Sequence, residues 1–418
     1  MAIPRITDLG IDEIRTIERL RAPSVIVEKR GEAAVAVDAY GRIIAGPSTD
    51  HGLVIHSAIR SLRNGGRVFI RGGMYVLQTA TKVFTDPNFQ PRIAVYIEGI
   101  PNLEIVCEKN AYFKAAPKTN LTPFWFESCP NLRWAGGTID GDKSNQTYNG
   151  SEPQIGYVLA LWNCDNSIVK DVTLLNAITD NLVLSNTKGT VHRYYGENIT
   201  SKGARYDGII VSGYYTEAQL TNIVTEGNGT GIEHISDNSK LFLTNFRADG
   251  IVARSNVLLV AENGLVTPPG NTANTPLFFI PPGDEFKGFL ENVVVEGGNP
   301  SPANKCIYIN RGRLYLHNVR LYNSGGYGIH ARDAAQIVMV GGEVVNHTSY
   351  GICLQGVNQV HYRSAVIGVR VTGCGVGIQL LNAQYCLILG NLVYGNTTAQ
   401  IQQDASSINN IIDHNITA

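Results

Sequence analysis

The sequence of 418 residues has little charge and no concentration of one sign. It holds 34 Lys and Arg against 35 Asp and Glu, for a formal net charge of −1, and no Lys/Arg cluster stands out. Nucleic acid is therefore not an expected partner, because it would require a basic stripe. No apolar run approaches the roughly 20 residues that cross a bilayer. Residues 1–5 lack the apolar stretch of a signal peptide, so we expect neither a membrane span nor a visible secretion signal.

Cysteine is scarce and scattered, which argues against a metal-binding or redox motif. The seven Cys form neither a CxxC pair nor a metal-ligand cluster, so no metal site is predicted from them. Cys129 and Cys164 occupy equivalent positions in two successive repeats, where they would stack about 5 Å apart. A disulfide and a pair of stacked free thiols both remain open for these two residues.

Glycine, by contrast, is abundant, with 44 residues, and it marks a repeated phrase. A turn that ends in Gly is followed by an Ile-led alternating strand, and several successive strand starts are 23 residues apart. The strand starts are Ile209, Ile232, Ile251, Ile329, Ile352 and Ile378, with earlier ones near Ile93, Phe124, Val158 and Leu182. Units of this length that contain strands and turns but no helix predict an all-β fold, a right-handed parallel β-helix of about a dozen rungs.

Asparagine columns support this register. Asn102, Asn131 and Asn166 fall at the same turn of three successive rungs, and Asn176, Asn323 and Asn346 each lie six residues before a strand start. Asn tolerates the left-handed backbone of a sharp turn, and its amide can bond to the rungs above and below. We therefore expect stacked asparagine ladders, which are structural.

The first ninety residues have a different pattern and predict a small α/β cap. Residues 1–47 hold an amphipathic helical segment at 7–21, possible as an oligomerisation element, and a hairpin over 24–38. Residues 48–90 hold a capping helix with Thr49 or Asp50 at its N-cap, a strand at 66–70 and a turn at 72–75. The β-helix itself is expected over 91–418.

The order of helix 50–62, strand 66–70 and the stretch 72–77 resembles the beginning of the pectate-lyase-like β-helix superfamily. That superfamily includes polygalacturonase-type hydrolases, polysaccharide lyases, uronan epimerases and phage tailspike depolymerases. The resemblance implies a protein that acts on or binds a polysaccharide, outside a cell or on a virion.

A local match to polygalacturonase-type hydrolases lies in the middle of the chain. Segments 137–141, 178–181, 205–208 and 229–231 follow the order of that family's motifs, and Asp180 and Asp207 match two of its three carboxylates. The chain departs from the family where Tyr206 replaces the usual acid and Thr230 replaces the histidine.

The residues themselves predict a carboxylate column on one face. Asp180, Asp207 and Asp249 precede strands at the same turn, and Glu233 should point outward one rung above Asp207. Rungs about 4.8 Å apart would place such carboxyls at the roughly 6.5–9.5 Å separation of inverting glycosidases. The candidate catalytic residues are Asp180, Asp207, Glu233, Arg205 and Tyr206. The candidate substrate-binding residues, expected to be an exposed groove of aromatic and polar groups, are Trp125, Glu127, Trp162, Ser212, Tyr214, Asp249 and Arg254. His234 should point inward as a core residue.

Three functions follow from this pattern. The first is a glycoside hydrolase with paired carboxylates. The second is a lyase on a uronate polymer, in which Arg205, Lys202 or Tyr206 acts as base. Only in the lyase would a cofactor be expected, Ca²⁺, for which the loop with Asp140, Asp142 and Asn145 is a candidate. The third is a non-catalytic glycan-binding or structural β-helix, such as a tail fibre, adhesin or filament subunit.

The two ends of the solenoid predict assembly. The last coil, residues 401–412, has no amphipathic cap after it, and the segment 7–21 has more apolar surface than a small cap requires. We expect a homo-oligomer, a trimer with side-by-side helices first and an end-to-end filament second.

Overall fold

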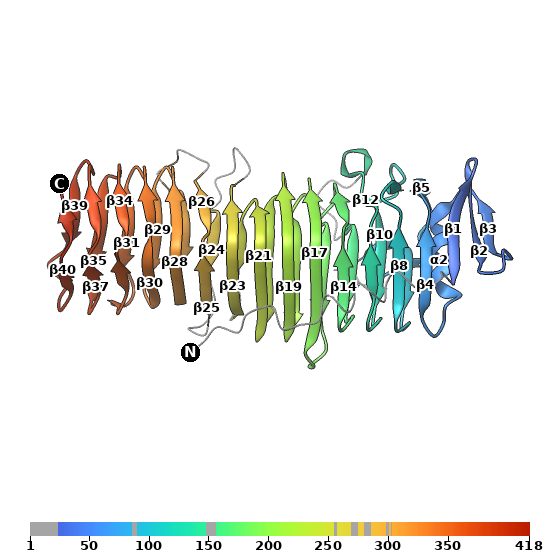
Figure 1. Ribbon diagram of the computed structural model, residues 1–418, viewed down its shortest axis with the longest axis horizontal. Helices are drawn as coiled ribbons and strands as arrows, with labels where there is room; N and C mark the ends of the chain where they lie inside the picture. The colour runs from blue at the N-terminus through green and yellow to red at the C-terminus, as the bar shows by residue number, and fades with distance from the viewer. Residues whose placement is uncertain are drawn as a thin grey trace.

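The computed structural model describes residues 24–85, 90–147, 156–254, 257–268, 275–279, 286–297, 301 and 303–418. The predicted helix over 7–21 lies outside the described residues. Figure 1 shows an elongated solenoid in which the strands lie side by side along the long axis, with α2 and β1–β3 at one end and β39–β40 at the other. The prediction of an all-β parallel solenoid of about a dozen rungs, with a small cap, is confirmed.

One large sheet has 14 strands and presents the face that carries the candidate site. Its strands are β6 (Lys82–Val83), β7 (Arg92–Glu98), β10 (Leu121–Glu127), β13 (Leu159–Trp162), β16 (Leu182–Asn186), β18 (Asp207–Tyr214), β20 (Thr230–Asp237), β22 (Ile251–Ala253), β24 (Leu277–Phe279), β27 (Lys305–Ile309), β29 (Tyr327–Arg332), β31 (Tyr350–Gln355), β35 (Val376–Leu381) and β39 (Ala399–Gln403). All pair in parallel except β6, which is antiparallel to β7.

The second sheet has 25 strands and forms the remaining walls. They are β1 (Val25–Arg30), β2 (Ala33–Asp38), β3 (Ile43–Ser48), β4 (Gly66–Ile70), β5 (Gly73–Leu77), β8 (Leu103–Cys107), β9 (Ala111–Ala115), β11 (Arg133–Ala135), β12 (Thr138–Asp140), β14 (Ser167–Lys170), β15 (Thr173–Leu175), β17 (His192–Lys202), β19 (Thr216–Glu226), β21 (Ser239–Ala248), β23 (Val257–Val266), β25 (Lys287–Glu291), β26 (Val294–Glu296), β28 (Gly312–Tyr322), β30 (Ala335–Val345), β33 (Ala365–Ile367), β34 (Arg370–Thr372), β37 (Leu387–Leu389), β38 (Leu392–Tyr394), β40 (Ile411–Asp413) and β41 (Ile416–Thr417). Two short strands, β32 (His361–Tyr362) and β36 (Ala383–Gln384), pair separately.

The register of the 14-stranded sheet follows the repeated Ile-led strand starts. The starts pair in successive rungs: Leu182 with Ile209, Ile209 with Ile232, Ile232 with Ile251, and likewise Ile329 with Ile352, Ile352 with Ile378 and Ile378 with Ile401. Most of these side chains are fully buried, because alternate residues of each strand point into the solenoid. The repeat in the sequence is therefore the repeat of the coil.

The turns between strands carry the predicted ladder. Asn131 donates its amide to Asn102 at 2.9 Å, and Asn166 donates to Asn131 at 2.8 Å, with all three backbones in the left-handed region. Asn346 donates to Asn323 at 3.3 Å, whereas Asn176 donates to Asp140 instead. All seven cysteines are buried and free, and the Cys129 backbone N–H lies 3.4 Å from Cys164 Sγ.

The described part of the cap agrees with the expected hairpin and helix. Strand β1 pairs antiparallel with β2 and parallel with β4, which joins the cap to the solenoid. Helix α2 (His51–Arg60) begins after Asp50, whose carboxylate accepts the Gly52 N–H at 3.2 Å. The predicted turn over 72–75 is wrong beyond Gly72, because Gly73–Leu77 forms β5 and buries Tyr75 against the first coil.

Candidate active site on the 14-stranded sheet

The candidate site begins with two carboxyls at the N-terminal edge of neighbouring strands. Asp180 lies two residues before β16, and Asp207 is the first residue of β18. Because β16 and β18 are paired rungs, Leu182 faces Ile209 and the two aspartates stack at the same turn. The repeat thus brings together two residues that are 27 apart in the chain.

Asp180, Asp207 and Glu233 form what we call the carboxyl cluster. The Asp207 backbone N–H donates a 2.9 Å hydrogen bond to Asp180 Oδ1, and the Asp207 carboxyl is in hydrogen-bond contact with those of Asp180 and Glu233. Burial raises the pKa of Asp180 to about 6, with hydrogen bonds from Asp207 opposing the shift and the charge of Glu233 adding to it. Burial also raises the pKa of Asp207 to about 9, and there the charges of Asp180 and Glu233 both add to the shift. The cluster therefore keeps at least one proton at neutral pH, because adjacent buried carboxyls cannot all ionise.

This contact corrects the expected spacing of the carboxyls. Stacking on successive rungs was expected to hold them roughly 6.5–9.5 Å apart. The structure instead has the Asp207 carboxyl in hydrogen-bond contact with both neighbours. A water molecule between acid and base requires one of the side chains to move aside.

Glu233 links the cluster to solvent. Its carboxylate forms a 2.5 Å ion pair with Arg254, whose side chain is 56% exposed against 14% for Glu233. Both residues are candidates from the sequence, and the pairing of β20 with β22 brings them together.

Two further groups at the cluster were missed as site residues. Thr230 hydrogen-bonds to the carboxyl of Asp207. Tyr157 lies near both aspartates: burial raises the pKa of its phenol, and the charges of Asp180 and Asp207 raise it further. Both residues stand at the same repeat position as Asp180 and Asp207, two residues before the inward-pointing residue at the start of a strand. The column position was therefore the signal that could have identified them.

Arg205 and Tyr206 form an exposed rim beside the cluster. The Arg205 guanidinium lies 5.5 Å from the centre of the Tyr206 ring, which is 48% exposed. Lys143 donates a hydrogen bond to the Gly203 carbonyl. Its pKa is lowered mainly by burial and further by the nearby charge of Arg205. Lys202, named as a possible lyase base, is turned to an exposed ion pair with Glu226 at 2.7 Å.

Aromatic residues lie on the same sheet toward the cap, but they are more covered than predicted. Trp125 points outward yet is only 2% exposed, because Phe84, Tyr157 and Trp162 pack around its ring at centroid distances of 5.7, 5.7 and 5.1 Å. The expectation of an exposed Trp125 ring is therefore wrong. The partly exposed Trp162 is the ring of this pair that a ligand can reach.

The other expected binding residues are dispersed. Glu127 accepts a hydrogen bond from the Tyr96 hydroxyl at 2.8 Å. Ser212 and Tyr214 lie farther along β18 than Asp207, and Tyr214 is 54% exposed. Asp249 does not join the cluster. Its carboxylate accepts the backbone N–H groups of Gly227 and Asn228, so it braces a turn.

His234 is a core residue, as predicted. It is 1% exposed, its Nε2 is 2.9 Å from Ser239 Oγ, and burial lowers its pKa to about 3. It stays neutral and takes no part in the carboxyl cluster.

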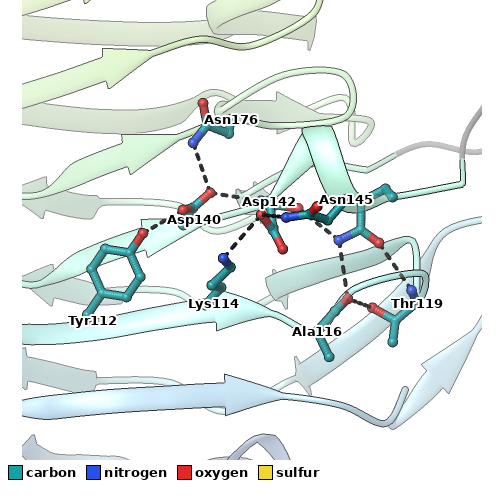
Figure 2. Close-up of polar contacts among 10 residues, drawn as sticks. Tyr112, Lys114, Ala116, Thr119, Asp140, Asp142, Asn145 and Asn176 are labelled. Carbon is teal, nitrogen blue, oxygen red and sulfur yellow. Dashed lines mark hydrogen bonds and ion pairs between the residues drawn. The ribbon is translucent and has the colours of Figure 1, made fainter.

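The loop proposed for Ca²⁺ is occupied by the chain's own donors (Figure 2). Asp140 accepts hydrogen bonds from Tyr112, Asn176 and the Asp142 backbone, and Asp142 pairs with Lys114 at 3.2 Å. The Lys114 ammonium stands where a cation would bind, so these residues do not fit Ca²⁺. Elsewhere in the described ranges, no group of three or more His, Cys, Asp or Glu residues is arranged to hold a metal ion.

Comparisons with known proteins bear on the fold. A family model described as a right handed beta helix region matches residues 305–418. A comparison with curated protein sequences finds no match. Within the described residues, no helix is long and apolar enough to cross a membrane.

Solved structures similar to the chain include a phage tailspike protein and two glucanases. Tailspike protein 3 of bacteriophage CBA120 is 12% identical with a TM-score of 0.50, over 98% of this chain and 68% of that one. The catalytic unit of a GH87 alpha-1,3-glucanase from Streptomyces thermodiastaticus is 11% identical with a TM-score of 0.53, over 89% and 66%. A GH87 alpha-1,3-glucanase catalytic domain in complex with nigerose is 13% identical with a TM-score of 0.52, over 86% and 67%. At such identities the likeness shows the fold alone, a right-handed parallel β-helix.

Proposed function

We propose that the protein is a glycoside hydrolase that cleaves a polysaccharide at the carboxyl cluster. The observation that carries the proposal is that the carboxyl cluster retains a proton at neutral pH while one of its three members, Glu233, is a carboxylate ion-paired with Arg254. Hydrolysis of a glycosidic bond needs these two partners, a protonated acid and a carboxylate base. The tailspike and the glucanases with the same fold are consistent with a carbohydrate substrate and with a location outside a cell or on a virion.

In this mechanism Asp207 is the general acid. It gives its proton to the glycosidic oxygen as the bond from that oxygen to the anomeric carbon breaks. Glu233, the cluster member that is ion-paired toward solvent, takes a proton from the water whose oxygen adds to the anomeric carbon. Asp180 holds the Asp207 backbone and keeps negative charge beside it, which maintains the raised pKa.

A lyase at the same place is less well supported. Its substrate would carry a carboxylate into a cluster of three acids, and the like charges would repel. Of the proposed bases, Lys202 is ion-paired with Glu226 and Arg205 lies over Tyr206.

A second candidate function is non-catalytic glycan binding or a structural shaft. The observation in its favour is that Asp180 and Asp207 are 7% and 5% exposed and that the hydrogen bond from the Asp207 backbone N–H to the Asp180 carboxylate bridges two rungs. In this case the carboxyls stabilise the turn and the outward face serves only to bind or to bear load.

Activity measurements on Asp207→Asn distinguish these functions. Incubation with a panel of neutral and acidic polysaccharides should release reducing ends, which a hydrolase produces, without the absorbance near 235 nm that marks lyase products. Asp207→Asn should lower the rate by about 10²–10⁴-fold, the usual contribution of a general acid. The matched control is Asp249→Asn, which changes a turn carboxylate outside the cluster and should leave the rate unchanged. Equal rates for wild type and Asp207→Asn would overturn the proposal.

A further inference from the structure

A second cluster of unusual side chains lies on the same outward face, closer to the C-terminus. It comprises Lys305 and Tyr308 on β27, Tyr327, His330 and Arg332 on β29, and Tyr350 on β31, and we call it the cation patch. These strands are consecutive in the 14-stranded sheet, so the residues stack on three adjacent rungs.

Aromatic rings pack against one another in the cation patch. Tyr327 stacks on Tyr350 at 5.1 Å and on His330 at 4.5 Å, and Tyr308 meets His330 edge-on at 5.6 Å. The three tyrosines are half-buried, which leaves part of each ring open to solvent. Flat, partly open rings of this kind are the surfaces on which sugar rings pack.

Two cations lie among these rings without a matching carboxylate. The Lys305 ammonium is 5.4 Å from the centre of the Tyr308 ring and 5.6 Å from that of Tyr327. Burial, and then the charge of Arg332, lower the pKa of Lys305, so the two cations are close enough to repel. Within the described part of the chain, neither cation forms an ion pair with an Asp or Glu.

The acid that follows Arg332 in the chain is already engaged. The Asp333 carboxylate accepts the backbone N–H groups of Val357 and Asn358 at 2.8 and 2.7 Å, and the Asn358 amide at 3.2 Å. Its oxygens are therefore bonded to that turn, although its charge still acts on His330.

Two buried polar atoms inside the patch have no hydrogen-bond partner. One is Arg332 Nε, which is a donor. The other is Nδ1 of His330, which is 7% exposed; its Nε2 donates to Gln355 Oε1 at 2.8 Å, so Nδ1 of the neutral ring is an acceptor. Buried polar atoms without partners cost free energy, and a ligand that offers an acceptor to Arg332 and a hydroxyl donor to His330 recovers it.

We propose that the cation patch is a binding site for a carboxylate-bearing sugar. Arg332 and Lys305 bind the carboxylate, for which a planar guanidinium is suited, and the tyrosine rings pack against the pyranose. The site is separated from the carboxyl cluster by five strand spacings from β18 to β29, roughly 24 Å along the same face. Binding here does not depend on whether the carboxyl cluster cleaves.

Binding of defined tetrasaccharides tests the proposal. Calorimetry on the full chain would compare tetragalacturonate with maltotetraose, which is neutral, and with a κ-carrageenan tetrasaccharide, which carries sulfates but no carboxylate. Tetragalacturonate should bind at least tenfold more tightly than either. Maltotetraose binding equally well would overturn the role of charge, and equal binding of the sulfated carrageenan fragment would overturn the preference for a carboxylate.

Variants locate the binding. Arg332→Gln and Lys305→Met should each weaken tetragalacturonate binding at least tenfold, with unchanged melting temperatures. The matched control is Arg313→Gln, which removes an exposed cation from β28 on the other sheet at the same level of the solenoid and should bind as wild type does. Unchanged affinity in both patch variants would refute the site. Asp207→Asn should keep full affinity, so loss of hydrolysis and loss of binding are separate results.

Discussion

At the scale of single residues, the carboxyl of Asp207 determines how the protein responds to pH. Its ordinary pKa is about 3.9 in an unfolded chain, and burial beside two other acids raises it to about 9 in the folded protein. Between these values the folded state holds a proton that the unfolded state has released. Stability contributed by the protonated form is therefore present at low pH and is lost as pH rises.

We predict that the free energy of unfolding falls between pH 5 and pH 9, and that Asp207→Asn removes part of this fall. The neutral amide does not need to ionise, so the stability of the variant relative to wild type should rise by about 4 kcal/mol from pH 5 to pH 8. Urea titrations at the two pH values measure this. A stability difference that stays the same at the two pH values would contradict the buried protonated carboxyl.

A residue on the rim of the aromatic cluster provides a separate test of the groove. Trp162→Ala removes the ring that stacks on Trp125 and should weaken binding of a neutral oligosaccharide substrate by about 1 kcal/mol. Affinity is measured with the Asp207→Asn background, so that the ligand is not cleaved. Tyr362→Ala, an exposed aromatic outside the 14-stranded sheet, is the control. Identical affinities for the two variants would place the groove elsewhere.

At the scale of elements, the ladder of Asn102, Asn131 and Asn166 joins turns that the sheets do not pair. Asn131 both donates to Asn102 and accepts from Asn166, and its backbone φ is 59°. The side chain and the backbone conformation of Asn131 therefore make separate contributions to the free energy of unfolding, and two different substitutions can measure them.

We predict that Asn131→Gly lowers the free energy of unfolding by about 1–2 kcal/mol through loss of the two amide contacts. Asn131→Ala should cost about 1 kcal/mol more, because alanine is strained in the left-handed region that glycine accepts. Thermal or urea denaturation of the two variants measures the difference. Equal losses would show that the backbone conformation carries no cost here.

Sequence periodicity predicted the coil well because each rung pairs with the next in a fixed register. The 23-residue step from Ile329 to Ile352 is one turn of the solenoid, and both side chains point inward at the same place in their strands. The sequence pattern did not predict how side chains of different rungs pack on the outer face. Alternation correctly pointed Trp125 outward, but it could not show that Phe84 and Tyr157, from other segments, cover the ring.

The site was predicted in part for the same reason. Column position identified Asp180 and Asp207, and it also included Asp249, whose carboxylate is held by the turn at Gly227 and Asn228. The repeat position determines where the Cα of an aspartate lies, whereas the rotamer and the hydrogen bonds of the side chain determine where its carboxyl group lies. The cation patch escaped prediction because Lys305 and Arg332 come from different rungs and meet only through side chains.

At the scale of the whole molecule, the final strands leave apolar side chains uncovered. Ile411 and Ile416 are 59% and 66% exposed on β40 and β41. Exposed strand edges with apolar residues favour association. The homo-oligomer expected from the sequence, a trimer first and a filament second, remains a prediction.

Light scattering tests it on the full-length protein and on a variant lacking residues 1–22. The full-length protein should exceed the mass of one chain at micromolar concentration, and the truncated one should be smaller if the segment lies at the interface. Ile411→Asp with Ile416→Asp should break an end-to-end filament and leave a side-by-side trimer intact. A full-length monomer would end the hypothesis.

The regular stacking of rungs also makes the solenoid a ruler. The carboxyl cluster and the cation patch are fixed on one face at a whole number of steps, each about 4.8 Å. Removing or inserting one coil between β20 and β27 changes their distance by one step and leaves the residues of both clusters as they are. For a polymer held at both places, the number of coils sets which spacing of charged sugars fits. A change in polymer repeat can then be met by a change in coil number, without altering a single side chain that binds or cleaves.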